Sequence, residues 1–318
     1  MLSAENRIVL VKEYIGQFKS IVGDGFVMLD EESLNNYAHD ETENLHFLPD
    51  VVIKPRTAEE ISAIMRICND QKIPVTPRGA GTGLAGAALP HFGGVLISME
   101  RMNSIVEIDE RNLQVVTEPG VITEVLQNAV KEKGLFYPPD PSSRGSCFIG
   151  GNISANSGGP KAVKYGVVKD YVLNLEVVLP TGEIIWTGAN VLKNSTGYNL
   201  TQLIVGSEGT LGIVTKIVLK LLPHPKHDLL MLVPFNNLEK AGEAVSAIFR
   251  AGFTPSALEL VEIDALKIVS KMMDSIAVPV NDGIAAHLII EVDGNHIETL
   301  MSEMEAIAEL LTQFDCGE

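Results

Sequence analysis

The chain has 318 residues, a length that corresponds to about two domains. Hydrophobic residues make up 46% and charged residues 20%, which provides enough apolar material for a core and excludes a disordered chain. Asp and Glu number 41 against 24 Lys and Arg, so the formal net charge is -17 and argues against binding to nucleic acid or anionic lipid. An anionic substrate would need a local cluster of positive charge.

The chain shows no pattern that targets a protein to a membrane or to an oxidising compartment. No apolar run approaches the roughly 18 residues of a membrane span, and the charged amphipathic start differs from a signal peptide. The three cysteines, Cys68, Cys147 and Cys316, are too far apart for a CxxC metal site or a disulfide framework. We expect reduced thiols and a cytoplasmic protein, with peripheral attachment to the inner face of the membrane left open.

The predicted elements divide the chain into three parts. Residues 1–46 form a helical lead-in, because their apolar residues recur at helical spacing. Residues 47–224 mix short strands and helices with three glycine-rich segments, and two prolines mark the end of this part. Residues 225–318 alternate strands with helices, which predicts a small sheet with helices on one face. The last helix carries a regular apolar stripe over 297–311.

One glycine pattern imitates a nicotinamide-binding motif. Gly81, Gly83 and Gly86 match G-x-G-x-x-G after a predicted strand. A parallel strand pair, however, needs a crossover of a dozen or more residues, normally a helix. Only AALPHFGG separates Gly86 from the next strand at Val95, and Pro90 with two glycines opposes a helix there. We therefore disfavour a Rossmann enzyme and expect either a plain tight turn or a loop whose backbone N–H groups bind anionic oxygens.

Three glycine-rich segments together give a more specific signal. They are PRGAGTGLAGAALP at 77–90, PPDPSSRGSCFIGGNISANSGGPKAVKYG at 138–166 and VGSEGTLGIVT at 205–215. With KNSTGYNLTQLIVGSEGTLGIVT at 193–215, they resemble the flavin-dependent 2-hydroxyacid dehydrogenases, which include the glycolate oxidase large subunit, D-lactate dehydrogenase and D-2-hydroxyglutarate dehydrogenase. The resemblance runs from about Tyr37 to Pro223. It implies an α+β fold in which a two-subdomain FAD-binding domain of the vanillyl-alcohol-oxidase type at 47–224 precedes a partial α+β cap at 225–318.

The resemblance also implies which residues contact FAD. In the family the first loop wraps the diphosphate, the second lies along the ribityl chain and isoalloxazine ring, and the third contacts the adenosine and flavin portions. Carried over, the cofactor-binding residues are Pro77, Arg78, Gly79, Ala80, Gly81, Thr82, Gly83, Leu84, Pro141, Ser142, Ser143, Gly150, Gly151, Asn152, Ala155, Asn156, Ser157, Gly158, Gly159, Glu208, Gly209 and Ile213. Thr82 stands where relatives with covalent FAD can carry His, so we expect non-covalent FAD and a packed thiol, rather than a tether, at Cys147.

Several side chains in these segments leave two interpretations open. Arg78 is either a charged donor to the cofactor or a surface arginine that holds a turn. Lys161 and Lys164 are either cations beside the flavin edge, where negative charge develops on reduction, or solvated lysines. Glu208 either accepts hydrogen bonds from a ribose or amide edge or caps its turn.

The family's catalytic segment has no counterpart in this sequence. In relatives, a segment of the H-x-G-D-G-N-x-H type binds a divalent metal such as zinc, and a later Glu-His pair is thought to abstract the hydroxyl proton. None of the seven histidines fits such a segment, and we interpret His224 and His227 as linker residues. We assign no metal ligand and no catalytic residue. Both would be expected in a full-length form of a truncated chain, or on a second polypeptide.

The resemblance implies an FAD-dependent oxidoreductase that converts a D-2-hydroxy acid of the glycolate, D-lactate or D-2-hydroxyglutarate type into the 2-oxo acid. The hydride would pass to flavin N5 and the electrons to an acceptor other than oxygen. The alternative is a flavin-binding subunit or fragment without catalysis of its own, and a further one is alcohol oxidation, sugar oxidation or alkyl transfer on the same FAD domain. The expected partners are a 2-hydroxy acid and an electron acceptor or partner subunit, and a homodimer is left open.

Overall fold

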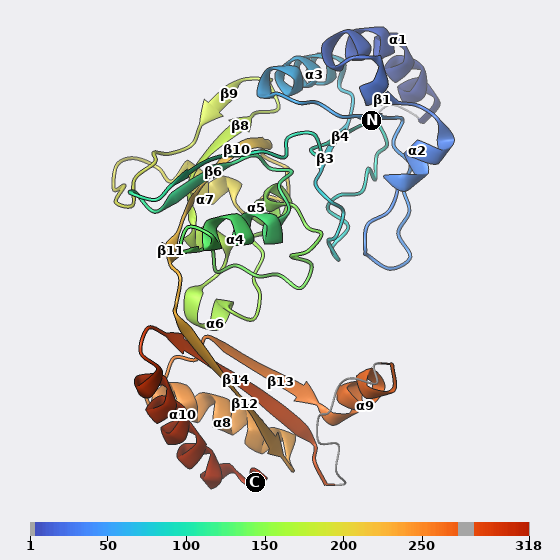
Figure 1. The fold of residues 1–318 in the computed structure, drawn as a ribbon. Helices are drawn as coiled ribbons and strands as arrows, with labels where there is room; N and C mark the ends of the chain where they lie inside the picture. Colours follow the sequence, from blue (N-terminus) through green and yellow to red (C-terminus); the bar gives the residue numbers. More distant parts are fainter. Residues whose placement is uncertain (1–3, 273–282, 318) are drawn as a thin grey trace. The chain divides into compact units, whose positions relative to one another are not determined.

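The computed structural model describes residues 4–272 and 283–317. The chain forms two compact units (Figure 1). The first unit contains Met1–Tyr137, Pro141–Ser157 and Val167–Pro223, and the second contains Pro138–Asp140, Gly158–Gly166 and His224–Glu318. Two short segments of the predicted FAD-binding part, Pro138–Asp140 and Gly158–Gly166, therefore belong to the second unit.

The first unit begins with a four-stranded sheet of order β1-β2-β4-β3. Its strands are β1 (Val27–Met28), β2 (Val51–Ile53), β3 (Val75–Arg78) and β4 (Val95–Ser98). The expected absence of a helix between β3 and β4 is confirmed, but the two strands still pair in parallel. The glycine-rich loop makes the crossover itself, so our premise that parallel pairing here requires a helix is wrong. Because that loop starts at the end of a buried strand, its first residues are held in place.

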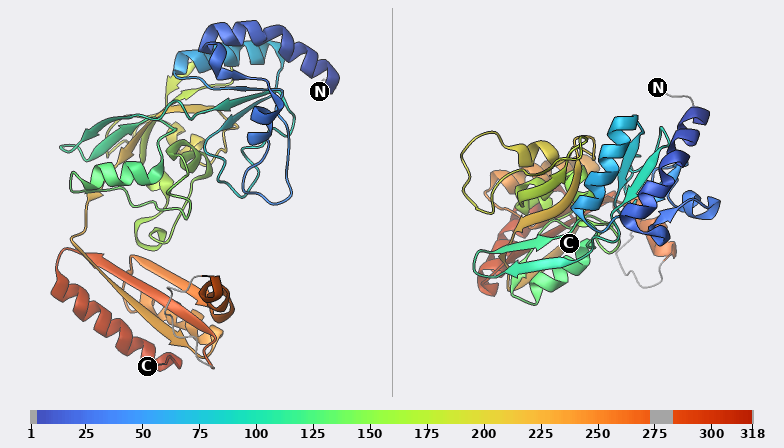
Figure 2. Two further views of the ribbon diagram at one scale, coloured as in Figure 1. Left: turned by 45° about the vertical axis from the view of Figure 1, so that its right-hand side comes forward. Right: turned by 90° about the horizontal axis from the view of Figure 1, so that it is seen from above.

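Helices α1 (Ala4–Val22) and α3 (Ala58–Gln71) lie side by side along this sheet (Figure 1, Figure 2). Thr57 caps the N-terminus of helix α3, and its hydroxyl accepts a hydrogen bond from the Glu60 N–H at 3.2 Å. Phe18 of α1 is buried in the same core cluster as α3 and β2. The predicted lead-in therefore packs as an integral layer of the first unit.

A five-stranded antiparallel sheet of order β5-β6-β10-β8-β9 forms the other half of the first unit. Its strands are β5 (Ile105–Asp109), β6 (Gln114–Thr117), β8 (Val172–Val178), β9 (Ile184–Trp186) and β10 (Ile213–Lys220). The turn between β8 and β9 is closed by the hydrogen bond from Leu179 N–H to Glu183 O at 2.8 Å. The remaining elements are η1 (Asp24–Phe26), α2 (Glu31–Asn36), α4 (Thr123–Lys131), β7 (Leu135–Phe136), α5 (Ile149–Ala155), η2 (Val168–Asp170), α7 (Leu200–Ile204) and β11 (Leu222–Pro223).

The second unit is the predicted small sheet with helices on one face. Strands β12 (His227–Phe235), β13 (Ala257–Glu262) and β14 (Ala286–Gly294) are antiparallel in the order β12-β14-β13. Helices α8 (Leu238–Arg250) and α10 (Ile297–Leu311) cover one face (Figure 1), and the unit also holds α6 (Ala162–Tyr165), α9 (Ile263–Met272) and η3 (Thr312–Phe314). Leu288 and Ile290 pack against these helices. Because side chains alternate along a strand, Glu291 and Asp293 lie on the opposite face.

The sequence also predicts reduced thiols and no membrane-spanning segment. Cys68, Cys147 and Cys316 are free thiols, and the first two are buried. Among the helices in the described ranges, none is both long enough and apolar enough to cross a lipid bilayer.

Candidate functional site

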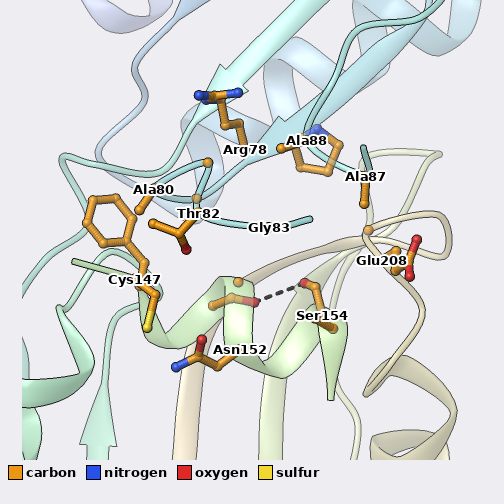
Figure 3. A pocket seen from close by; sticks show the side chains of 18 of the residues that line it. Arg78, Ala80, Thr82, Gly83, Ala87, Ala88, Cys147, Asn152, Ser154 and Glu208 are labelled. Carbon is orange, nitrogen blue, oxygen red and sulfur yellow. Dashed lines mark hydrogen bonds between the residues drawn. The ribbon is translucent and has the colours of Figure 1, made fainter. Parts of the chain in front are cut away.

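A cavity lies within the first unit where the three glycine-rich segments meet (Figure 3). Three parts of the chain form its wall, namely the loop that follows β3, the region of α5, and the turn that leads into β10. In Figure 3, Thr82 and Gly83 of the loop face Asn152 and Ser154 of α5, and Glu208 approaches from the third segment. The tertiary fold therefore brings three distant segments to one site.

Most of the predicted cofactor-binding residues line this cavity. They are Pro77, Arg78, Gly79, Ala80, Gly81, Thr82, Gly83, Leu84, Ser143, Gly150, Gly151, Asn152, Ala155, Ser157, Glu208, Gly209 and Ile213. The predicted residues outside its lining are Pro141, Ser142, Asn156, Gly158 and Gly159. Asn156 instead ends α5 in a left-handed conformation with φ of 47°, and its side-chain oxygen accepts from the Lys169 N–H at 2.9 Å. The two glycines belong to the second unit.

Sequence reasoning missed several residues of the wall. They are Asp40, Ala85, Ala87, Ala88, Met99, Pro119, Cys147, Phe148, Ser154, Gly212 and Val214. Most of these lie inside the three motifs next to predicted residues, so a complete reading of each motif could have found them. Asp40, Met99 and Pro119 lie outside the motifs, and no local pattern marks them.

Arg78 is a buried cation at the entrance of the first loop. Only 7% of its surface is exposed, and its Nη1 has no hydrogen-bond partner. Burial lowers the pKa of Arg78, and the charge of Asp40 opposes that shift. Asp40 also lines the cavity with a buried, unpartnered Oδ2. The interpretation of Arg78 as a surface arginine is therefore wrong, and the two orphaned polar atoms provide unused hydrogen-bonding capacity at the cavity.

The conformation of the first loop depends on Gly81. Its φ is 73°, and a Cβ at this position would lie 2.2 Å from Nη2 of Arg78. The guanidinium thus packs directly against the loop backbone, where any side chain would displace it. In Figure 3 the Arg78 side chain points away from α5, so it acts from the loop side of the cavity. A glycine-rich backbone backed by a cation suits an anionic ligand such as a diphosphate.

A polar cluster holds the strands beneath this loop. The Tyr37 hydroxyl donates to Oε1 of Glu100 at 2.5 Å, and the Lys54 ammonium lies 3.0 Å from the same oxygen. Burial alone would raise the pKa of Glu100, but hydrogen bonds from Tyr37, Ser98 and Lys54 hold it below its usual value. The Tyr37 ring also faces the Arg78 guanidinium, with 5.6 Å between the guanidinium carbon and the ring centroid. The cluster therefore fixes the position of Arg78.

Buried polar contacts also position α5. Cys147 is 3% exposed, and its sulfur lies 3.3 Å from the Thr123 hydroxyl oxygen. That oxygen accepts a hydrogen bond from Nδ2 of Asn152 at 2.6 Å. The Ser154 hydroxyl donates to the Gly150 carbonyl at 3.0 Å, as Figure 3 shows. Cys147 is therefore both a wall residue of the cavity and part of the network that fixes the helix.

Glu208 connects the third segment to α5. Its backbone adopts φ of 52°, which is uncommon for a residue with a side chain, and its N–H donates to the Ser154 carbonyl at 2.9 Å. The side chain is exposed and lines the cavity. A carboxylate repels phosphate and accepts hydrogen bonds from hydroxyl groups, so this position suits a ribose.

Lys161 and Lys164 are both held in ion pairs. Neither side chain lines the cavity, and neither is freely solvated. Lys161 pairs with Glu291, and the Lys164 ammonium lies 2.5 Å from Oδ1 of Asp293. Their acceptors come about 130 residues later in the chain, so no local pattern could have revealed them.

The histidines at the boundary between the two units have no metal-site geometry. Nδ1 of His224 lies 2.7 Å from the carbonyl oxygen of Pro225, and His227 is exposed at the start of β12. No group of three or more His, Cys, Asp or Glu residues in the described part of the chain is arranged to hold a metal ion.

Comparisons with known proteins agree with this geometry. Residues 49–188 match the family described as FAD binding domain, and residues 224–318 match the C-terminal domain of FAD linked oxidases. The chain is 44% identical to glycolate oxidase subunit GlcD of Bacillus subtilis and 39% identical to a D-lactate dehydrogenase of Anaerostipes hadrus. These alignments cover 88% and 95% of this chain but only 58% and 64% of the two relatives. The chain thus spans about three fifths of their length.

A solved structure supports the fold. The 4-ethylphenol oxidase of Gulosibacter chungangensis superposes with a TM-score of 0.78 at 23% sequence identity. The superposition covers 98% of this chain and 64% of the oxidase. The expected fold, an FAD-binding domain of the vanillyl-alcohol-oxidase type followed by an α+β domain, is confirmed.

Proposed function

The chain belongs to the family of FAD-linked oxidoreductases that includes glycolate oxidase, D-lactate dehydrogenase and D-2-hydroxyglutarate dehydrogenase, and from this premise we propose its reaction. The protein oxidises a D-2-hydroxy acid to the corresponding 2-oxo acid. FAD is held non-covalently in the cavity of the first unit, and the electrons pass to an acceptor other than oxygen. When bound, FAD supplies the acceptor for the hydride that leaves C2 of the hydroxy acid.

The observation that carries this proposal is the meeting of three glycine-rich segments around buried polar atoms that lack partners. Backbone N–H groups over 79–83 bind the diphosphate, and the Arg78 guanidinium adds positive charge behind them. Asn152 and Ser154 present an amide and a hydroxyl on the facing helix. Glu208 accepts a hydrogen bond from a ribose hydroxyl. The Thr82 hydroxyl is a weak nucleophile and does not replace the histidine that can tether the flavin ring.

The first test is the visible absorbance spectrum of the purified chain, recorded before and after acid precipitation. Flavin that appears in the supernatant supports a non-covalent site, whereas colour that stays with the precipitate contradicts it. The second step is anaerobic mixing with D-lactate, D-2-hydroxyglutarate, glycolate and the L enantiomers. Bleaching by a D acid or by glycolate, but not by an L acid, is the expected result.

A second candidate is a flavin-binding subunit that depends on another polypeptide for catalysis. The observation in its favour is that the chain spans only 58% of one relative, which is itself named as a subunit of glycolate oxidase. In that case the bound flavin would be reduced by dithionite but by none of the hydroxy acids. Substrate bleaching would then require an added partner, which distinguishes the two candidates.

A further inference from the structure

A loop connects the flavin cavity to the sheet of the second unit. Ser157 is the last residue of the first unit before this loop, and Val167 is the first residue after it. The base of the loop is closed by a hydrogen bond from the Val168 N–H to the Ser157 carbonyl at 3.1 Å. Residues 158–166, between these points, belong to the second unit. The loop therefore has its base in one unit and its tip in the other.

The tip is fastened to Asp293 of β14. The Lys164 ammonium contacts Oδ1 of Asp293 at 2.5 Å and donates to its backbone carbonyl at 2.9 Å. The Tyr165 hydroxyl lies 2.9 Å from both carboxylate oxygens. Only 1% of the Asp293 side chain is exposed. The carboxylate is therefore surrounded by donors that come from the loop.

A second ion pair holds the start of the tip. The Lys161 ammonium pairs with Glu291, which also accepts from the Ser256 hydroxyl at 2.6 Å. The Lys161 N–H donates to Oδ1 of Asp140 at 3.2 Å. A Cβ at Gly159 would lie 2.4 Å from the carbonyl oxygen of Asp140, so only glycine permits this approach. The tip is thus fixed on both sides by residues of the second unit.

The ion pairs at these contacts favour one defined position of the loop on β14 over a non-specific contact. Two lysines face two carboxylates, so the formal charges sum to zero within a largely buried site. Removing one partner leaves a partly buried charge without its counter-charge. An apolar contact could hold the loop as strongly, but it would allow the loop to shift along β14. The four charged groups define one position for the loop relative to β14.

The base of the same loop forms part of the cavity wall. Ser154 and Ser157, which precede the loop, line the cavity. The Ser154 carbonyl accepts from the Glu208 N–H at 2.9 Å, and the Ile153 carbonyl accepts from the Gly206 N–H at 3.0 Å. A shift of the loop base would therefore disturb both the end of α5 and the third glycine-rich segment.

We propose that the Lys164–Asp293 and Lys161–Glu291 pairs position the FAD site through the loop 158–166. Asp293 and Glu291 are positioning residues, because neither lines the cavity. This inference rests on the proposed FAD site but is independent of which hydroxy acid is oxidised. The second unit thereby contributes to cofactor affinity although none of its residues lines the cavity.

The test is the dissociation constant of FAD, measured by flavin fluorescence titration of the full chain. Asp293→Asn and Lys164→Met should each raise this constant about threefold to thirtyfold, the range expected for coupling through packed residues. Asp228→Asn is the matched control. Asp228 is the cross-strand neighbour of Asp293 on β12 and is exposed, so its substitution should leave the constant unchanged.

Two additional measurements separate positioning from folding. Trp186, the single tryptophan, lies in the first unit, so its fluorescence shows whether that unit stays folded in each variant. The double variant of Lys164→Met and Asp293→Asn should raise the constant by no more than the larger single effect, because both changes break one linkage. Tyr165→Phe keeps both ion pairs and should give a smaller increase.

An unchanged dissociation constant in folded Asp293→Asn and Lys164→Met would overturn the proposal, even if the second unit became less stable. If Asp293→Asn fails to fold, Lys164→Met and Tyr165→Phe decide the question by the same criterion. A wild-type chain that binds no FAD would instead contradict the proposed function itself.

Discussion

Lys164 and Asp293 are joined by two contacts, since the lysine ammonium lies 2.5 Å from Oδ1 and 2.9 Å from the backbone oxygen of the same aspartate. The pair links a loop of the flavin-binding motif to a strand almost 130 residues later. The Lys164 ammonium is therefore held by both the carboxylate and the backbone carbonyl of Asp293.

The Lys164–Asp293 pair should contribute measurably to the stability of the second unit. Asp293→Asn leaves two lysines near an uncharged amide, and breaking a buried pair in this way costs about 3–5 kcal/mol. Urea unfolding followed by circular dichroism should show the loss, while Trp186 fluorescence follows only the first unit. The exposed Asp228→Asn control should stay within about 0.5 kcal/mol of wild type. Equal effects of the two substitutions would contradict this account.

Gly81 and Gly83 should respond differently to alanine. A Cβ at Gly81 would strike Arg78 and would require φ of 73°, so Gly81→Ala should lower the unfolding free energy of the FAD-free chain by about 1–3 kcal/mol. A Cβ at Gly83 meets nothing within 4 Å, so Gly83→Ala should leave that free energy unchanged. Because Gly83 lines the cavity, its substitution should weaken FAD binding instead. Thermal unfolding without FAD and an FAD titration separate the two effects.

His287 should make the chain sensitive to acid. It is fully buried on β14, both ring nitrogens lack partners, and burial lowers its pKa. The unfolded chain takes up a proton below about pH 6.5 while the native imidazole stays neutral, so stability falls as the pH drops below that value. One proton sets an upper limit of about 1.4 kcal/mol per pH unit on this slope, and the contribution fades as the pH rises above 6.5.

Replacing His287 by leucine should flatten this part of the stability profile. His296 is exposed at the start of α10, so His296→Gln should leave the slope in place. Urea midpoints measured between about pH 5 and 8 would show the difference. A slope that persists in His287→Leu would assign the acid sensitivity to other groups.

Two tyrosine hydroxyls should have opposite effects on the stability of the first unit. The Tyr137 hydroxyl is buried without a hydrogen-bond partner, and burial raises its pKa. Tyr137→Phe removes an unsatisfied polar group and should stabilise the first unit by about 1 kcal/mol. The Tyr37 hydroxyl donates to Glu100 at 2.5 Å, so Tyr37→Phe should destabilise it by a similar amount. Thermal unfolding of both variants tests the contrast, and destabilisation by Tyr137→Phe would indicate a partner for that hydroxyl.

The local elements could be predicted because their signals are short-range. The N-cap at Thr57 and the turn before Glu183 each depend on neighbouring residues, so spacing along the chain is enough to indicate them. The parallel pairing of β3 with β4 could not be predicted, because a flexible loop can cross over without a helix when both ends are held by a sheet.

The parts of the candidate site that present backbone groups to a ligand could be predicted from the sequence. Glycine-rich motifs identify such segments directly, and most of the residues taken from them line one cavity. Asp40 was missed because a lone acidic residue in a polar stretch carries no pattern. Gly158 and Gly159 belong to the second unit, because the structure divides between two units a motif that is continuous in sequence.

The sequence by itself determined the family, the FAD-binding loops and the strand–helix alternation of the second unit, because these depend on residue type and spacing along the chain. Only the tertiary structure decided what the charged side chains do. Arg78 is buried behind the first loop, and Lys161 and Lys164 face carboxylates of β14. The reason is physical, since the environment of a charge depends on partners that the fold brings together from distant parts of the chain.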